Sequence, residues 1–182
     1  RIYHFIGKDN IPYHTIFWPG MLLANDDYSL PYRVAGLQYL NYEGGKISKS
    51  REWGIFCENL PEAGLSSDIW RFYLTLLIPE TNDTEWKWRE FRERINNELV
   101  ANLGNFVFRT LSFIKNNFDG RVPKERLENE DKEVLKSTRM LAGEYRRLME
   151  DIKLRDGLRK VLELSDKGNK YFQKTEPWKT VK

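Results

Sequence analysis

Cysteine and long apolar runs are scarce in this chain. Of its 182 residues only Cys57 is a cysteine, which excludes an internal disulfide and any Cys-x-x-Cys metal site within the chain and favours a reducing, cytoplasmic environment. No apolar run approaches the ~18 residues that cross a membrane, and the start has no signal-peptide pattern. We therefore expect a cytoplasmic protein that does not bind membranes.

What is present indicates a folded protein with a packed core. Hydrophobic residues make up 40% of the chain, aromatic residues 14% and charged residues 31%, with a net charge of +3. The length suits one domain or two small ones. The chain begins with Arg1 rather than Met, inside a predicted strand, so we expect it to be a piece of a longer protein.

Positive charge gathers in the second half of the chain. Residues 139–160 hold seven basic residues against four acids, and residues 167–182 hold five lysines against one acid. Such a surface suits a nucleic-acid partner, but a solvated helix face explains it equally well.

The first 45 residues predict a parallel βαβ unit. Residues 1–6 are β-rich, residues 12–24 predict a helix that Pro19 would kink, and residues 33–42 predict a second strand. Ligands of such units gather at the carboxyl ends of the strands. The polar loops GKDN (7–10) and GGKISKS (44–50) both follow a predicted strand there.

The second half predicts an antiparallel helical bundle. We expect helices over residues 68–77, from Trp86 onward, and over about 129–148 and 153–174. Residues 83–95 alternate in charge sign, as a solvated helix face does. Apolar residues recur every three or four positions in two stripes that we expect to be buried: Ile95, Leu99, Leu103, Phe106, Thr110 and Phe113, then Leu154, Leu158, Leu162, Ser165 and Phe172. The predicted fold class is α/β followed by all-α.

Four motifs occur in an order that resembles a known family. They are YHFIGKDNIPYHTIFWPGMLL (3–23), KISKS (46–50), NNELVANLGNFVFR (96–109) and KTEPWK (174–179). Together they resemble the methionyl-tRNA synthetases, which belong to the class I aminoacyl-tRNA synthetases. The resemblance implies the distal part of a Rossmann-type catalytic domain over 1–45, a KMSKS loop and stem-contact linker over 46–85, and an anticodon-binding bundle over 86–182 that normally continues further.

KISKS then corresponds to the pyrophosphate-contacting loop of this family. When a carboxylate attacks the α-phosphate of ATP, charge builds on the leaving pyrophosphate, and mobile ammonium groups stabilise it. The resemblance assigns catalysis to Lys46, Ser48 and Lys49, and ATP binding to Ile47 and Lys49. Ile47 replaces the more usual Met or Phe, and Glu52 replaces a glycine. By itself KISKS fits an exposed basic turn just as well.

The GKDN loop and the following helix supply further candidates. Gly7 would let the nucleotide approach the backbone closely, and the resemblance gives Lys8 a role in activation and Asp9 a role in binding the ribose hydroxyls. His14 and Trp18 lie four apart on one helix face, and the resemblance places them at the methionine pocket. Without the resemblance, Asp9 fits a turn or helix cap, and the other two fit a half-buried core.

The last two motifs carry the candidate anticodon readers. Unpaired bases are recognised by hydrogen bonds and by stacking on aromatic rings. Asn105 and Arg109 share a helix face, and Pro177 and Trp178 follow the last predicted helix. The resemblance implies that these four residues read the CAU anticodon of tRNA(Met), with Asn102 as a further candidate.

The implied activity is that of a methionine–tRNA ligase, which uses ATP with Mg²⁺ to activate methionine and transfers it to tRNA(Met). The HIGH motif belongs to an amino-terminal half that this chain lacks, and His4-Phe5-Ile6-Gly7 is only superficially similar to it. We therefore expect no activity from the chain alone and no metal site in it, and any zinc only in the missing amino-terminal part.

Three alternatives remain open at this point: a non-catalytic RNA-binding module, a helical protein-interaction bundle, and a class I synthetase for Leu, Ile, Val or Cys. HTIFWPGM together with EPW argues against the last of these.

Overall fold

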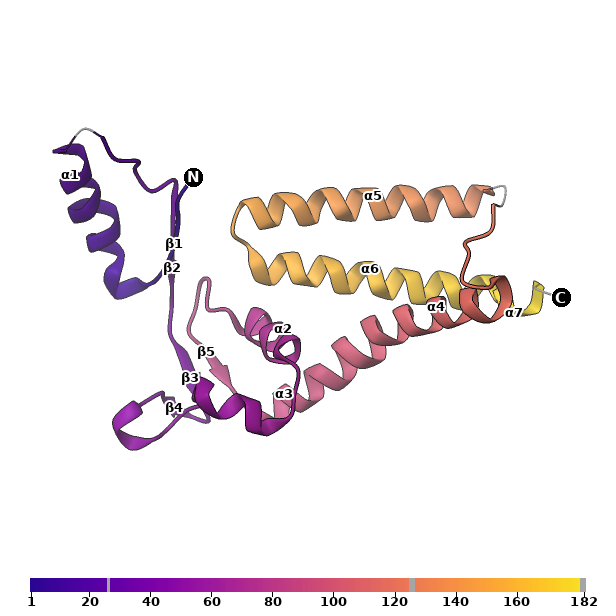
Figure 1. Ribbon diagram of the computed structural model, residues 1–182, viewed down its shortest axis with the longest axis horizontal. Helices are drawn as coiled ribbons and strands as arrows, with labels where there is room; N and C mark the ends of the chain where they lie inside the picture. Colours follow the sequence, from indigo (N-terminus) through magenta and orange to yellow (C-terminus); the bar gives the residue numbers. More distant parts are fainter. Residues whose placement is uncertain (26, 125–126, 181–182) are drawn as a thin grey trace. The chain divides into compact units, whose positions relative to one another are not determined.

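The structure is a computed structural model that describes residues 1–25, 27–124 and 127–180. Its chain divides into two compact units (Figure 1). The N-terminal unit contains Arg1–Ser66 and Leu77–Trp88, and the helical unit contains Ser67–Leu76 and Arg89–Lys182. The three-part division predicted from the sequence stays a proposal.

The N-terminal unit begins with the predicted βαβ arrangement. Strand β1 (Tyr3–Gly7) pairs in parallel with β2 (Arg33–Leu37). The helix between them starts with π-helical turns over Tyr13–Phe17 and continues as α1 (Trp18–Leu23). Because Pro19 lacks an N–H group and its ring disturbs α-helical bonding, we attribute the π-helical turns to this proline.

The single strand predicted over residues 33–42 is wrong. Strand β2 ends at Leu37, and Leu40–Tyr42 forms β3 in a second sheet. At the break, the N–H of Gln38 donates to the Pro79 carbonyl (2.8 Å) and the N–H of Tyr39 donates to Asp83 Oδ1 (3.0 Å). The chain leaves the first sheet because these two N–H groups bond to a distant segment instead.

The second sheet has the strand order β4-β3-β5. Strand β4 (Gly45–Lys46) pairs antiparallel with β3, and β5 (Thr84–Trp86) pairs in parallel with it. The GGKISKS loop therefore belongs to a hairpin of this sheet, and the prediction that it follows a parallel strand beside β1 is wrong.

The predicted start of the helical half at Trp86 is also wrong. Residues 84–86 form β5, and α3 (Trp88–Arg94) begins two residues later. The Trp86 side chain is only 3% exposed. Burial of this indole outweighs the charge alternation that favoured a solvated helix over residues 83–95, because a large aromatic ring loses far more water-exposed surface than the neighbouring charges do.

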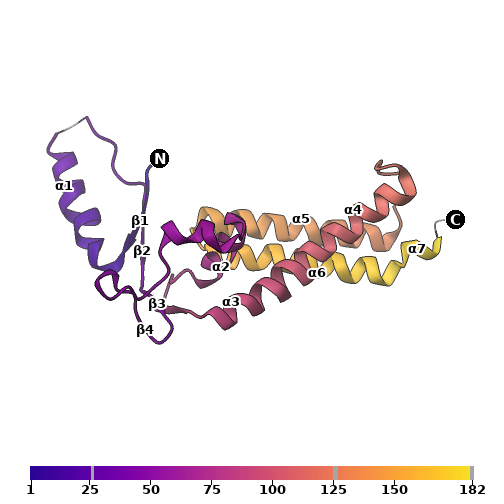
Figure 2. The same cartoon turned by 60° about the horizontal axis from the view of Figure 1, so that its bottom comes forward.

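The helical unit confirms the predicted bundle. Helix α3 continues through a π-helical segment (Ile95–Gly104) into α4 (Asn105–Phe118), and α5 and α6 run antiparallel side by side (Figures 1 and 2). In the described residues, no helix is both long and apolar enough to cross a bilayer. The remaining helices are α2 (Ser67–Leu77), α5 (Asn129–Glu150), α6 (Leu154–Thr175) and α7 (Pro177–Thr180).

Aromatic packing forms the core beside α2 and α3. Trp70 stacks on Phe91 with ring centroids 5.1 Å apart, and Tyr73 meets the same ring edge-on at 5.3 Å. Along the predicted stripes, Ile95, Leu162 and Ser165 are buried, and the other members are half-buried. The predicted faces are therefore the ones that pack.

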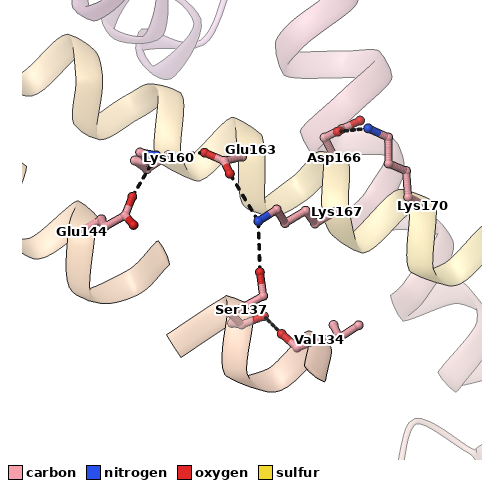
Figure 3. Close-up of polar contacts among 9 residues, drawn as sticks. Val134, Ser137, Glu144, Lys160, Glu163, Asp166, Lys167 and Lys170 are labelled. Atoms are coloured by element: carbon pink, nitrogen blue, oxygen red, sulfur yellow. Dashed lines mark hydrogen bonds and ion pairs between the residues drawn. The ribbon is translucent and has the colours of Figure 1, made fainter. Parts of the chain in front are cut away.

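Polar contacts fix the register of α5 against α6 (Figure 3). Lys160 bridges Glu144 of α5 (2.8 Å) and Glu163 of its own helix (3.1 Å). Lys167 contacts Glu163 (3.3 Å) and Ser137 of α5 (3.0 Å). Each exposed ion pair contributes only about 0–1 kcal/mol, so these contacts specify alignment more than they stabilise.

Asp131 joins the start of α5 to the end of α6. In a capping box, its carboxylate accepts the backbone N–H of Glu128 (2.7 Å), and it also accepts the Tyr171 hydroxyl. The Tyr171 hydrogen bond and the Glu128 N–H lower the pKa of Asp131. The same hydrogen bond raises the pKa of Tyr171 to about 12.

Two helical glycines make a matched test of the packing. A Cβ at Gly168 would lie 2.4 Å from the Phe106 ring, whereas a Cβ at Gly143 meets nothing within 4 Å. We expect Gly168→Ala to lower the free energy of unfolding of the helical unit by about 1–3 kcal/mol through overpacking. Gly143→Ala should raise it by about 0.4–1 kcal/mol. Urea denaturation followed by circular dichroism measures both, and equal effects would contradict the close approach of α4 to α6.

The Asp131–Tyr171 contact predicts a pH-dependent stability. Because the pKa of Asp131 is lowered from 3.8, its contribution to the free energy of unfolding is fully present above pH 3.8. This contribution is lost as pH falls through the pKa of Asp131 in the folded state. Because the pKa of Tyr171 is raised from 10.0 to about 12, its contribution is complete below 10.0 and is lost as pH rises through about 12. Tyr171→Phe should therefore destabilise the helical unit at neutral pH, and this loss should shrink in acid.

The measurement is urea denaturation across the pH range in which the protein stays folded. Tyr145→Phe on α5, which removes a hydroxyl from a tyrosine that is 39% exposed, serves as the control and should leave stability unchanged. A Tyr171→Phe effect that stays constant below pH 3.8 would contradict the assignment.

Candidate functional site

The GKDN loop leaves β1 beside open space. A Cβ at Gly7 would meet nothing within 4 Å, so the backbone here is accessible to a ligand. Residues Lys8–Asn10 form a short 3-10 turn. The Lys8 ammonium donates to Gln38 Oε1 (2.8 Å) and lies 3.6 Å from the Asp83 carboxylate. The loop is thus tied to the break between β2 and β3.

Tyr39 lies at the centre of this group. Its hydroxyl donates to the Asp9 carboxylate. The Lys8 ammonium lies 4.4 Å from the ring centroid, and the Lys46 ammonium lies 5.8 Å from it. Residues of the GKDN loop and of KISKS, which are far apart in the sequence, therefore meet at one aromatic ring.

The charges of this group shift two pKa values. The Tyr39 N–H, and then Lys8 and Lys46, lower the pKa of Asp83. The hydrogen bond to Asp9 raises the pKa of the Tyr39 hydroxyl, which therefore stays protonated and donates at neutral pH. Neither Tyr39 nor Asp83 is among the site residues predicted from the sequence, because neither belongs to a motif and their contact spans 44 residues.

KISKS is part of a closed loop with left-handed backbone at its turns. Before it, Glu43 and Gly44 have φ of 42° and 82°, which suits a tight hairpin. After it, Ser48 and Trp53 exchange two backbone hydrogen bonds of 2.8 and 3.0 Å. Lys49 lies inside this loop, and within the described residues its ammonium group has no hydrogen bond or ion pair. It can therefore meet a ligand.

The two departures from the family pattern lie in the same loop. Ile47 packs on the backbone at Gly54, where a Cβ would lie 3.0 Å from its Cγ2 atom. Glu52 has φ of 51°, in the left-handed region that costs a residue with a side chain about 1–2 kcal/mol. A glycine adopts this conformation without that cost, which gives a physical reason for glycine as the usual residue here.

The predicted pair His14 and Trp18 is part of a three-ring cluster. Their ring centroids are 6.3 Å apart. His4 of β1 stacks on Trp18 at 4.8 Å, and its Nδ1 lies 3.2 Å from Nδ1 of His14, so one ring donates and the other accepts. His4 is not among the site residues predicted from the sequence, because HFIG is only superficially similar to a signature motif. All three rings are half-buried.

In the helical unit, the predicted Arg109 and Trp178 come together. The Arg109 guanidinium lies 4.8 Å from the Phe172 ring and 6.0 Å from the Trp178 ring, and it donates to Gln173 Oε1 at 3.2 Å. Pro177 opens α7 directly after Glu176, whose φ of 42° ends α6. This turn brings the Trp178 ring to 5.7 Å from Phe172 and leaves the tryptophan 42% exposed.

Arg109 and Asn105 also line an open groove of about 440 Å³ between α6 and the α4 helix with its π-helical start. Asn102, the further candidate, donates to the Leu162 carbonyl (3.2 Å) and accepts from Asn169 (3.0 and 3.3 Å). Its side chain thus joins two helices. Asn169 and Gln173 could not be predicted from the sequence, because polar residues on a basic helix give no signal of their own.

In the part of the chain that the structure describes, no cluster of three or more His, Cys, Asp or Glu side chains could hold a metal ion.

Comparisons with known proteins give these clusters a context. The family model for "tRNA synthetases class I (M)" matches residues 1–111. The methionine–tRNA ligase of Nanoarchaeum equitans is 43% identical over 98% of this chain and 25% of its own length. The cytoplasmic methionine–tRNA ligase of Xenopus laevis is 42% identical over the whole chain and 20% of its own length. The chain thus spans a fifth to a quarter of the length of these curated relatives.

Among solved structures, the chain is similar to Mycobacterium tuberculosis methionyl-tRNA synthetase bound by methionyl-adenylate. The TM-score is 0.84 at 29% identity, over 97% of this chain and 34% of that one. The fold therefore agrees with a part of such an enzyme. Since the family model also covers more than half of the residues, the chain belongs to the class I tRNA synthetases of the (M) family, the methionyl-tRNA synthetases.

Proposed function

We propose that the protein containing this chain is a methionine–tRNA ligase that activates methionine with ATP and transfers it to tRNA(Met). The observation that carries the proposal is the meeting of Lys8, Asp9 and Lys46 around Tyr39. It supports one nucleotide site built from the GKDN and KISKS loops. The relatives with which this chain shares 42–43% identity bear the name of this activity.

In this site the lysines would stabilise the charge that develops on pyrophosphate. The methionine carboxylate attacks the α-phosphate, the bond to the β-phosphate breaks, and the leaving pyrophosphate gains negative charge. Lys46 and Lys49 of KISKS, with Lys8, supply these ammonium groups. Ser48 and Ile47 shape the loop that carries the two KISKS lysines. Asp9 binds the ribose hydroxyls. Gly7 lets the nucleotide approach the backbone. We give Lys49 the largest share, because its ammonium is not engaged elsewhere in the described residues.

His14 and Trp18 would border the methionine side chain. A thioether packs well against aromatic rings, and the three-ring cluster with His4 offers such a surface. The similar Mycobacterium enzyme is bound by methionyl-adenylate, which supports this choice of substrate.

The helical unit would read the anticodon. Arg109 and Asn105 offer hydrogen bonds from one groove, and the exposed Trp178 ring, turned by Pro177, offers a stacking surface beside Arg109. These groups match the way in which proteins read unpaired bases.

ATP would enter with Mg²⁺, but we assign the ion no ligand in this chain. Magnesium is bound through one or two carboxylates and the phosphates of the substrate. The nearby Asp83 carboxylate is engaged by the Tyr39 N–H and by Lys8, and we assign Asp9 to the ribose rather than to the ion. We also propose the cytoplasm as the location, in line with the name of the Xenopus relative. A non-catalytic RNA-binding role for the isolated chain is the alternative, because the HIGH half lies outside it.

The role of Lys49 is tested in a full-length ligase that carries this sequence. Lys49→Ala should slow methionine-dependent ATP–pyrophosphate exchange about 10²-fold or more, the usual cost of removing one charge-stabilising donor. Lys115→Ala, an exposed lysine on α4, is the control and should leave the rate unchanged. An unchanged rate in Lys49→Ala would refute the assignment.

Anticodon reading is tested with tRNA stem-loops that differ only in the anticodon. The CAU stem-loop should bind more tightly than one with a changed anticodon, and Trp178→Ala or Arg109→Ala should weaken the CAU complex about tenfold or more, since a base stack is worth ~1–3 kcal/mol. Filter binding at fixed salt measures this.

Arg159→Ala on α6 removes the same charge from an exposed residue paired with Asp156. It should reduce only the salt-dependent, sequence-independent term. Equal affinity for both stem-loops would contradict anticodon reading.

A further inference from the structure

Tyr39 is the residue through which the two loops of the candidate nucleotide site touch. Its hydroxyl donates to Asp9, and its ring is approached by the ammonium groups of Lys8 and Lys46 at 4.4 and 5.8 Å. It lies between β2 and β3, outside both the GKDN and KISKS motifs. Its side chain is 40% exposed, so it is not a core residue that packing alone would explain.

The backbone holds Tyr39 firmly in place. Its N–H donates to Asp83 Oδ1 (3.0 Å), and its carbonyl accepts the N–H of Thr84 (2.9 Å). The preceding N–H, of Gln38, is bound by the Pro79 carbonyl (2.8 Å). These hydrogen bonds fix the backbone from which the tyrosine side chain extends toward Asp9.

The hydrogen bond from the Tyr39 hydroxyl affects how the Asp9 carboxylate would bind a ligand. A carboxylate has two oxygens and accepts about four hydrogen bonds, so the Tyr39 hydroxyl occupies one position and leaves acceptor capacity for ribose hydroxyls. A fixed donor also restricts rotation of the carboxylate. The remaining acceptor positions are therefore oriented before the nucleotide arrives, which reduces the entropy lost on binding.

The Tyr39 ring attracts the two lysine ammonium groups weakly. A cation on an aromatic face at an exposed site gains about 0.5–1 kcal/mol. This attraction keeps Lys8 and Lys46 at the site, yet it is weak enough for a phosphate group to replace the ring as their partner. The Asp83 carboxylate also lies 3.6 Å from the Lys8 ammonium.

We propose that Tyr39 is a positioning residue for ATP, which orients Asp9 toward the ribose through its hydroxyl and gathers Lys8 and Lys46 through its ring. The proposal deepens the proposed function, because it rests on Asp9 as the ribose ligand. Tyr39 itself does not touch the reacting atoms.

The test uses Tyr39→Phe in the full-length ligase, because phenylalanine keeps the ring and removes only the hydroxyl. We expect the KM for ATP in methionine-dependent pyrophosphate exchange to rise about tenfold, the effect of losing one hydrogen bond to a charged group. The kcat and the KM for methionine should stay within about twofold. A merely structural defect would instead change all three.

A second readout asks whether the effect passes through the ribose. With 2′-deoxyATP and 3′-deoxyATP, the analogue that lacks the hydroxyl bound by Asp9 should show little further loss in Tyr39→Phe. Non-additivity of this kind indicates that the two groups act on one contact. Tyr28→Phe, at a 64% exposed tyrosine of the same unit, is the control and should behave as the parent enzyme with every nucleotide.

Tyr39→Leu, a variant that also removes the ring, should lower kcat in addition, because Lys8 and Lys46 lose their common surface. Its folding is checked by circular dichroism and by binding of the CAU stem-loop.

Each outcome separates this proposal from the one it rests on. No exchange in the unmodified full-length protein would overturn the proposed function itself. Normal exchange with an unchanged KM for ATP in Tyr39→Phe would overturn the role of Tyr39 alone. A KM that rises, relative to the parent enzyme, by the same factor for ATP and for both deoxy analogues would also overturn it, because the hydroxyl would then act without the ribose.

Discussion

Two backbone N–H groups, those of Gln38 and Tyr39, determine the arrangement of the N-terminal unit. They donate to Pro79 and Asp83, from a segment about 40 residues further along the chain, rather than to a neighbouring strand. This ends β2, directs the chain into a second sheet and brings the KISKS hairpin next to the GKDN loop. Gln38 is half-buried and Tyr39 is exposed, so the first N–H has the greater need of a protein acceptor, and together the two contacts build the site.

This dependence explains what the sequence could and could not predict. The local patterns predicted the βαβ unit, the helical bundle and the faces that pack, because periodicity and proline act over a few residues. Residues 33–42 formed an unbroken β-rich run, and nothing within them marks the break at Gln38. Residues 84–86 likewise join a sheet through burial of Trp86. Both errors come from partners that are distant in the sequence.

The residues of the candidate site likewise fall into those that the sequence could predict and those that it could not. Motif residues such as Lys46, His14 and Arg109 could be named from the sequence, because their types and spacing resemble a family pattern. Their supporting partners, His4, Tyr39 and Asp83 in the N-terminal unit and Phe172 and Gln173 on α6, contact them only in three dimensions. Arg109 shows this well: its guanidinium is placed by two aromatic rings and an amide, and none of these belongs to its own helix.

The cluster around Tyr39 is electrically balanced, with two ammonium groups, Lys8 and Lys46, near two carboxylates, Asp9 and Asp83. At Lys8 and Lys46 an incoming anion must therefore compete with internal counter-ions, unlike at Lys49, whose ammonium has no such partner in the described residues. A ligand with a single negative charge gains little from that exchange, whereas a triphosphate offers several charges at once and can replace both contacts. In the proposed nucleotide site, this balance would favour ligands of high charge density over monovalent anions.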